Sequence, residues 1–134
     1  MSTNKSERYQ LNLWEPGDDF IRTEFNENFE KLDGAARVVF GTYTGDGAAT
    51  RHIELGFQPA GIILMREDGI MAPSATSIYG GLAFQNRPAH STMWGNKDLF
   101  SVDESGFTVH YQLFEHLTIT VNTLDYVYFY MAIR

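Results

Sequence analysis

Residues 117–133 read LTITVNTLDYVYFYMAI, and this stretch decides the fold class. Over residues 117–121 Leu, Ile and Val alternate with threonine, which is the two-residue period of a β-strand. After a turn at 122–125, residues 127–133 are largely apolar on both of their alternating faces. Such a strand either lies at the centre of a covered sheet or presents one face to another subunit.

The same period recurs through most of the preceding chain. It is found at residues 37–44, 51–57, 62–65, 82–85, 99–102 and 107–111. Glycine-containing turns at 45–47 and 104–106 indicate hairpins. Seven or eight short strands separated by turns predict a mainly β domain over residues 35–134, with an antiparallel, jelly-roll-like β-sandwich as its architecture.

One segment has a helical period instead. Over residues 18–32 apolar side chains recur every three or four positions and form one stripe. Thr23 is the expected N-cap, and Gly34 marks the stop. Two asparagines inside the segment are poor helix formers, so packing must hold this helix in place. Residues 1–34 are therefore expected to form an arm and a short amphipathic helix for attachment or oligomerisation.

The apolar side chains of this N-terminal segment are the expected assembly contacts. Trp14 needs an apolar surface, which either this chain's own domain or a partner supplies. A single short helix cannot bury its stripe alone, so it caps the β domain or bundles with copies of itself. The expected contacts are Trp14, Phe20, Ile21, Phe25, Phe29 and Leu32.

Composition restricts the classes of function. The 134 residues carry a net charge of −7 and contain no cysteine. The negative charge disfavours nucleic acid and anionic membrane surfaces, and the lack of cysteine excludes disulfides and thiolate metal sites. Residues 1–8 are polar, unlike a signal peptide, and no apolar run is long enough to cross a bilayer. We expect a soluble protein that is made in the cytoplasm and does not insert into membranes.

Residue types that serve catalysis are present without a catalytic pattern. His52 and Glu54 share one face of a strand, where a solvated surface is the simpler interpretation. His110 and His116 lack metal-ligand spacing, and Asp18–Asp19 suits the start of a helix. The sequence therefore predicts no catalytic residue, no metal site, no cofactor and no enzymatic activity.

The longest connection, residues 71–97, is rich in glycine, proline and polar side chains. Long loops in compact domains often bind ligands, although an ordinary loop that folds back on the domain is the competing interpretation. Aromatic faces combined with planar polar side chains suit the apolar faces and hydroxyl rims of sugars. The candidate contacts are Tyr79, Gln85, Asn86, Arg87, His90, Trp94 and Asn96.

Two blocks of the sequence resemble phage and prophage tail proteins of Gram-positive bacteria. The first resembles the Trp-containing arm and acidic, Asn-rich helix at the start of many such proteins, and it comprises YQLNLWE at 9–15, DF at 19–20, TEFNEN at 23–28 and KLD at 31–33. The second is similar to a β-sandwich domain at the ends of tail fibres, and it comprises GTYTGDG at 41–47, IELGFQP at 53–59, SGFTV at 105–109 and the Tyr-rich ending with Tyr128, Tyr130 and Ala132.

This resemblance implies a component of a virion or tail-like particle, with a homotrimer favoured. Such a component joins tail or baseplate proteins, or binds a glycan on the host surface. No long shaft separates the two blocks, which suits a short tip, collar or baseplate decoration. Two other classes remain open: a free-standing carbohydrate-binding, lectin-like module, and, ranked last, a glycan depolymerase, which needs paired carboxylates in a cleft.

Overall fold

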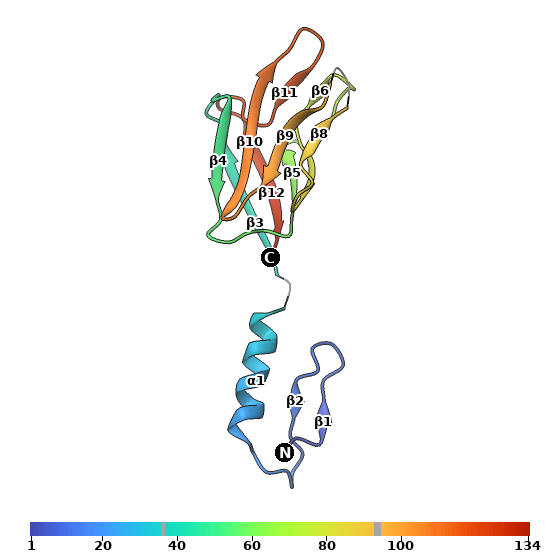
Figure 1. Cartoon of the computed structure of the whole chain (residues 1–134), viewed down its shortest axis with the longest axis vertical. Helices are drawn as coiled ribbons and strands as arrows, with labels where there is room; N and C mark the ends of the chain where they lie inside the picture. Colours follow the sequence, from blue (N-terminus) through green and yellow to red (C-terminus); the bar gives the residue numbers. More distant parts are fainter. Residues whose placement is uncertain (36, 93–94) are drawn as a thin grey trace. The chain divides into compact units, whose positions relative to one another are not determined.

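The computed structural model describes residues 1–35, 37–92 and 95–134. The chain forms two compact units, Met1–Ala36 (unit 1) and Arg37–Arg134 (unit 2). The described residues are mainly β, with several antiparallel sheets and one helix (Figure 1).

Unit 1 consists of a short hairpin and the helix. Strand β1 (Asn4–Lys5) pairs antiparallel with β2 (Asn12–Leu13), and α1 spans Arg22–Asp33. The expected N-cap at Thr23 is wrong, because Ile21 occupies the cap position and makes no side-chain cap hydrogen bond.

Asp18 lies in the loop before the helix and binds backbone groups of that loop and of the N-terminal segment. Its Oδ2 accepts hydrogen bonds from the backbone N–H groups of Thr3 and Glu15, both at 2.9 Å. Hydrogen bonding, first from the Glu15 backbone and then from Thr3, lowers the pKa of the Asp18 carboxyl. Asp18 therefore closes the loop before the helix, which corrects its expected role as a helix cap.

A pair of asparagines ties the hairpin to the helix. The backbone N–H of Asn12 donates to Oδ1 of Asn28 at 2.6 Å, and Nδ2 of Asn28 donates back to the Asn12 carbonyl at 3.0 Å. Nδ2 of Asn12 also donates to the Glu24 carbonyl at 2.6 Å. Asn28 thus disfavours the helix by propensity but fixes it to β2 through its side chain.

Unit 2 contains two sheets. The four-stranded sheet has the order β3-β12-β5-β7, and the six-stranded sheet has the order β6-β11-β10-β9-β8, with β4 also paired to β10. Every strand pairing is antiparallel except that of β11 with β6. The strands are β3 (Val38–Thr44), β4 (Thr50–Glu54), β5 (Gly61–Arg66), β6 (Ser77–Ile78), β7 (Gly81–Phe84), β8 (Ala89–Ser91), β9 (Lys97–Val102), β10 (Gly106–Leu113), β11 (Thr118–Thr120) and β12 (Val127–Ile133).

The turn at 45–47 does not close a hairpin, contrary to expectation. Strand β3 pairs with β12 and β4 pairs with β10, so the chain crosses here from one sheet to the other. The fully buried Asn122 holds the crossing, because its Nδ2 donates to Asp46 Oδ1 at 2.6 Å and to the Ala48 carbonyl at 3.0 Å. The turn at 104–106 does join a hairpin, between β9 and β10.

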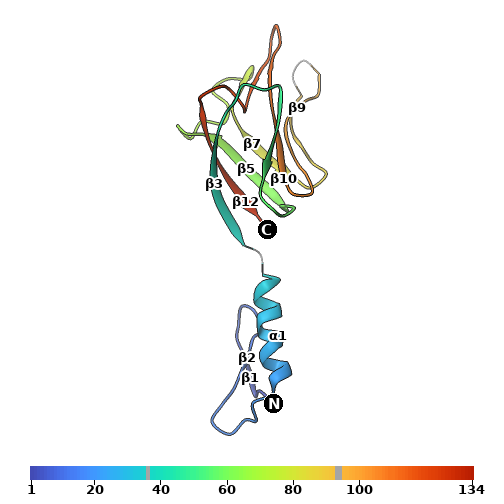
Figure 2. The same cartoon turned by 90° about the vertical axis from the view of Figure 1, so that its left-hand side faces the viewer.

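The core of unit 2 receives side chains from both sheets. Tyr43 of β3 stacks on Tyr128 of β12, with ring centroids 5.1 Å apart. Phe107 of β10 meets Tyr43 edge-on at 6.1 Å and Tyr130 at 5.2 Å. Figure 2 shows β3, β12, β5 and β7 following one another across their sheet. One face of this sheet is therefore covered by aromatic and aliphatic packing.

Candidate functional site

The opposite face of the four-stranded sheet is also apolar. Cross-strand register places Phe40, Met131, Ile63 and Leu82 in one row across all four strands. Residues of the four strands that share this side form the outer face. None of them is charged, and they are Val38, Phe40, Thr42, Thr44, Gly61, Ile63, Met65, Leu82, Phe84, Val127, Phe129, Met131 and Ile133.

The outer face is largely open in a single chain. Phe40 is 78% exposed, Leu82 51% and Phe129 44%. A groove of about 540 Å³ is lined by Phe40, Phe129 and their neighbours on β3, β5 and β12. Sheets with one solvated face usually alternate apolar and polar residues, and this alternation is missing here. A contiguous apolar surface of this kind marks an interaction site.

The size of the outer face suits contact with a protein. Its five most exposed apolar residues have a combined accessible surface of roughly 500 Å². They are Val38, Phe40, Leu82, Phe84 and Phe129. A stable protein interface of standard size buries about 800 Å² on each partner. The exposed side chains therefore supply most of such an interface, and the half-buried ones beside them extend it.

The expected assembly contacts of unit 1 form a line of aromatic contacts. Ring centroids are 5.0 Å apart between Trp14 and Phe20, 5.2 Å between Phe20 and Phe25, and 5.0 Å between Phe25 and Phe29. Trp14 thus lies on residues of its own unit. The line is covered on one side only, since Phe20 is 62% and Phe29 57% exposed. Ile21 and Leu32 are exposed as well.

The expected glycan contacts do not converge on one pocket. Tyr79 lines a small cavity, and His90 lines a separate groove of about 300 Å³. Residues 85–87 form an exposed turn after β7, and Asn96 is exposed just before β9. Trp94 lies outside the described residues. Of the six candidates that the structure describes, Tyr79 is the one that lines the small polar cavity.

That cavity, which we call the Arg66 cavity, has a volume of about 130 Å³, and Arg66, Tyr79 and Tyr126 form part of its lining. The guanidinium carbon lies 4.1 Å from the ring centroid of Tyr79 and 5.7 Å from that of Tyr126. Arg66 Nε donates to Asp68 Oδ2 at 2.9 Å, which fixes the guanidinium. The remaining lining is formed by Thr120, Thr123 and Tyr128. Aromatic rings, hydroxyls and an oriented Arg–Asp pair are groups that bind small polar ligands.

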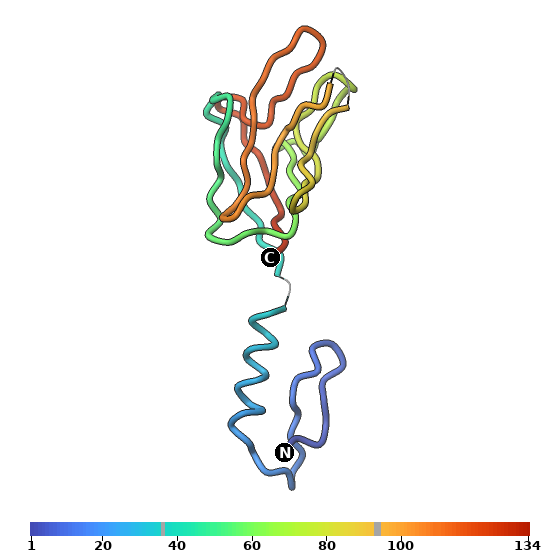
Figure 3. The backbone as a smooth tube through the Cα atoms, viewed as in Figure 1, coloured from blue at the N-terminus to red at the C-terminus, as the bar shows by residue number. Residues whose placement is uncertain are grey.

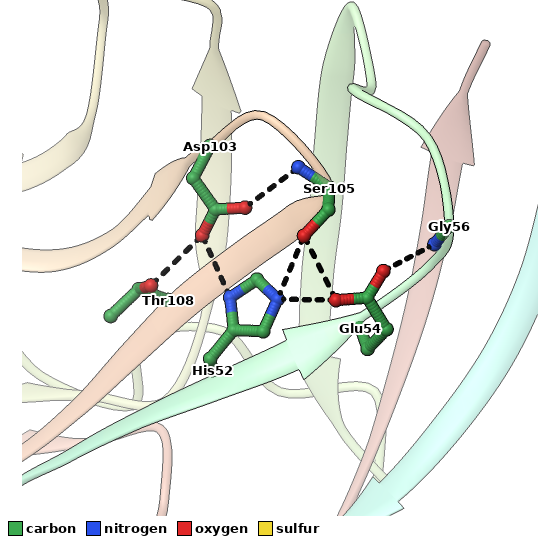
Figure 4. A network of polar contacts seen from close by, with 6 residues as sticks. All are labelled: His52, Glu54, Gly56, Asp103, Ser105 and Thr108. Carbon is green, nitrogen blue, oxygen red and sulfur yellow. Dashed lines mark hydrogen bonds and ion pairs between the residues drawn. The ribbon is translucent and has the colours of Figure 1, made fainter.

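His52 joins a polar cluster on the six-stranded sheet. Its Nδ1 lies 2.9 Å from Asp103 Oδ2, and its Nε2 lies 3.0 Å from Glu54 Oε2 (Figure 4). Ser105 Oγ donates to Glu54 Oε2 at 2.8 Å and lies 3.2 Å from His52 Nε2. Thr108 Oγ1 donates to Asp103 Oδ2 at 2.9 Å. The cluster therefore links β4 to the β9–β10 hairpin.

Ser105, His52 and Asp103 are the residue types of a catalytic triad, but their hydrogen bonds differ from those of a working triad. A catalytic histidine accepts the serine proton on a free ring nitrogen. Here both ring nitrogens face carboxylates, an arrangement that favours the protonated imidazole, which donates on both sides. Partial burial lowers the pKa of His52, but hydrogen bonds and charges from Glu54 and Asp103 outweigh it, and the pKa lies above its ordinary value. Ser105 bonds to Glu54 instead, which helps to lower the pKa of that carboxyl.

Neither a metal site nor a membrane-spanning helix occurs in the described part of the chain. No three His, Asp or Glu side chains there are grouped so that they could hold a metal ion. Within the same residues, no helix has the length and apolar character needed to cross a membrane.

Comparison of the chain with protein-family models, with curated proteins and with solved structures found no match.

Proposed function

We propose that this protein is a structural or receptor-binding component of a phage tail or phage-tail-like particle and functions as an assembly of several copies. Unit 2 is an antiparallel, jelly-roll-like β-sandwich in this proposal, and unit 1 attaches it to other tail or baseplate proteins. The proposal includes no catalytic step and no cofactor. The protein resides in the particle, and the resemblance of the sequence implies three copies.

The outer face is the observation that carries this proposal. A protein that worked as a single soluble chain would gain nothing from thirteen uncharged positions on the solvent side of a sheet, and such a surface promotes aggregation. Contact with further copies of the same chain removes the outer face from water. We favour other copies as the occupant because every copy of the chain carries the same apolar surface, so one kind of chain supplies all sides of the contact.

The exposed aromatic line of unit 1 supports the same proposal independently. Phe20 and Phe29 are more than half exposed, and the helix that carries Phe29 has no buried residue. An amphipathic helix is stabilised mainly by burying its apolar stripe. We propose that a neighbouring tail protein or other copies of unit 1 cover this stripe in the particle.

The first experiment measures the mass of the protein in solution by light scattering. We expect a multiple of 15.2 kDa for the wild type. Phe129→Glu places a charge on the outer face and is expected to shift the mass toward that of one chain. Leu113→Glu is the matched control, because Leu113 is 65% exposed on β10 and does not belong to the outer face.

Two results would contradict the proposal. One is a wild type that has the mass of a single chain at every concentration up to about 100 µM. Its self-association would then be weaker than that of a protein with a standard-size interface. The other is the absence of the protein from purified tail particles when these are analysed by mass spectrometry. Equal effects of Phe129→Glu and Leu113→Glu would show that the outer face is not the contact.

A free-standing carbohydrate-binding module is the second candidate, and the Arg66 cavity favours it. The cavity offers three tyrosine side chains and two threonine hydroxyls in a space suited to part of one sugar ring. Titration with neutral monosaccharides, followed by amide chemical shifts, should then perturb Tyr79 and Tyr126 first. Tyr79→Ala should remove the response, whereas Tyr9→Ala, in unit 1, should not. Unchanged shifts at millimolar sugar would exclude this candidate.

A further inference from the structure

Strand β3 forms an open edge of the four-stranded sheet. In the described part of the chain β3 pairs with β12 and with no other strand. Its seven residues, VVFGTYT, make it one of the longer strands of unit 2. An edge strand presents a row of unpaired backbone N–H and C=O groups, which is a template for pairing with another chain.

The alternation of the β3–β12 ladder identifies these open groups. The N–H of Gly45 donates to the Tyr126 carbonyl at 2.8 Å, and the N–H of Arg134 donates to the Arg37 carbonyl at 2.7 Å. In an antiparallel ladder only every second residue bonds to a given neighbour. Odd-numbered residues from 37 to 45 therefore bond to β12, and even-numbered residues direct their N–H and C=O groups away from it.

Three residues on this edge keep both backbone groups available. The carbonyl of Thr44 accepts a hydrogen bond from the Arg51 guanidinium, which covers that end of the edge. Val38, Phe40 and Thr42 have no such bond within the described residues. Their side chains lie on the outer face, so the open edge and the apolar surface are continuous.

The edge also lacks the features that natural proteins use to block pairing. Such features are charged side chains, proline, a bulge or a very short strand. Residues 38–44 contain neither a charge nor a proline, and their register with β12 runs without a shift. The opposite edge, β7, has only four residues and is followed directly by a turn. Of the two edges of this sheet, β3 is therefore the one that is long and regular enough to pair along its length.

We infer that β3 pairs antiparallel with β3 of a second copy of this chain and joins two four-stranded sheets into one of eight strands. A strand that pairs with itself does so about a two-fold axis, because both copies then contribute the same residues. Phe40 and Thr42 of one copy lie opposite Thr42 and Phe40 of the other in such a register. The inference rests on the proposed assembly of several copies, and it replaces the three-copy arrangement with an even number.

Amide hydrogen exchange tests this pairing without a mutation. The amides of Val39, Gly41 and Tyr43 are bonded to β12 in every state, and they should exchange slowly at all concentrations. Those of Val38, Phe40 and Thr42 should slow by at least about tenfold when the protein associates, and should become fast again on dilution. Fast exchange at these three positions in the associated protein would overturn the inference.

A proline at position 42 provides a second test. Thr42→Pro removes an N–H that points away from β12, so it should leave the intramolecular ladder intact. We expect this variant to lose self-association by tenfold or more in dissociation constant, while Thr42→Val, which keeps the N–H, associates like the wild type. Near-ultraviolet circular dichroism verifies that both are folded, and the exchange experiment decides the question if the proline variant is not.

The two proposals fail in different ways. If Thr42→Pro associates normally while Phe129→Glu does not, edge pairing is wrong and assembly through the outer face stands. A mass of three chains would likewise overturn edge pairing alone. A wild type that remains a single chain would overturn both.

Discussion

The two faces of the four-stranded sheet have the same apolar character but very different surroundings. On the inner face Leu64, Tyr128 and Ala132 have no exposed surface, whereas on the outer face Phe40 and Phe129 are 78% and 44% exposed. The strands are the same, and neighbouring residues along each strand experience the two environments in alternation. The difference shows that folding of one chain buries the inner face of this sheet and leaves much of the outer face open to solvent.

The largest expected effect comes from truncating neighbouring residues of β5. Leu64→Ala removes a fully buried side chain and should lower the free energy of unfolding by about 2–5 kcal/mol. Ile63→Ala, on the outer face, should lower it by less than about 1.5 kcal/mol in dilute protein, where single chains predominate. Urea denaturation of both variants measures the two values. Similar losses would mean that the outer face is packed within one chain.

A smaller effect is expected from a polar group of the inner face. The Tyr43 hydroxyl donates to the Val121 carbonyl in the core, and Tyr43 is 7% exposed. Tyr43→Phe leaves that carbonyl without its donor and should lower the free energy of unfolding by about 1–3 kcal/mol. Tyr126→Phe, whose ring is 46% exposed, serves as the control and should change stability by less than about 0.5 kcal/mol. Thermal denaturation measures both.

The smallest effect concerns the His52 cluster and depends on pH. The raised pKa of His52 stabilises the fold below its unfolded value of 6.5, and this contribution is lost as the pH rises through the folded pKa. The lowered pKa of Glu54 stabilises the fold above 4.5, and this contribution is lost as the pH falls through its folded pKa.

The cluster should therefore contribute most to the stability of the fold between pH 4.5 and pH 6.5. His52→Gln should lower the melting temperature more at pH 5.5 than at pH 8.5. Thermal denaturation of wild type and variant at both pH values measures this difference. The effect is small because the cluster is exposed to solvent. An equal change at both pH values would show that the charge of His52 contributes nothing.

Periodicity in the sequence is sufficient to predict most strands of unit 2 and the helix, because burial of alternating side chains is a local property. Strand pairing is not predictable in the same way. The turn residues at 45–47 favour a tight reversal, but they do not determine which strand returns beside β3, and the partner is β12 at the far end of the sequence. The expected N-cap at Thr23 is wrong because the helix already begins at Arg22, after Ile21. Asp18 bonds to Thr3, fifteen positions away, and no local pattern predicts this contact.

The candidate sites show the same limit. The sequence of β12 shows that both of its faces are apolar. This pattern is compatible with an exposed face but does not predict that one of the two faces is exposed. The His52 cluster is not visible there, because Asp103 and Ser105 lie more than fifty positions from His52 and become neighbours only through the β4–β10 pairing. Arg66 and Tyr126 likewise belong to different segments, and no spacing in the sequence connects them. Contacts across strands need the register, which depends on the whole sheet.

The first and last strands of unit 2, β3 and β12, pair with each other, and this pairing has a mechanical consequence. The N–H of Arg134 donates to the Arg37 carbonyl, so the first and last residues of unit 2 lie at the same end of one antiparallel pair (Figure 3). A load pulling these two residues apart acts on the first hydrogen bond alone, then on the next, and opens the pair like a zipper. Unit 2 therefore resists tension between Arg37 and Arg134 only weakly, because its backbone hydrogen bonds open one at a time under such a load.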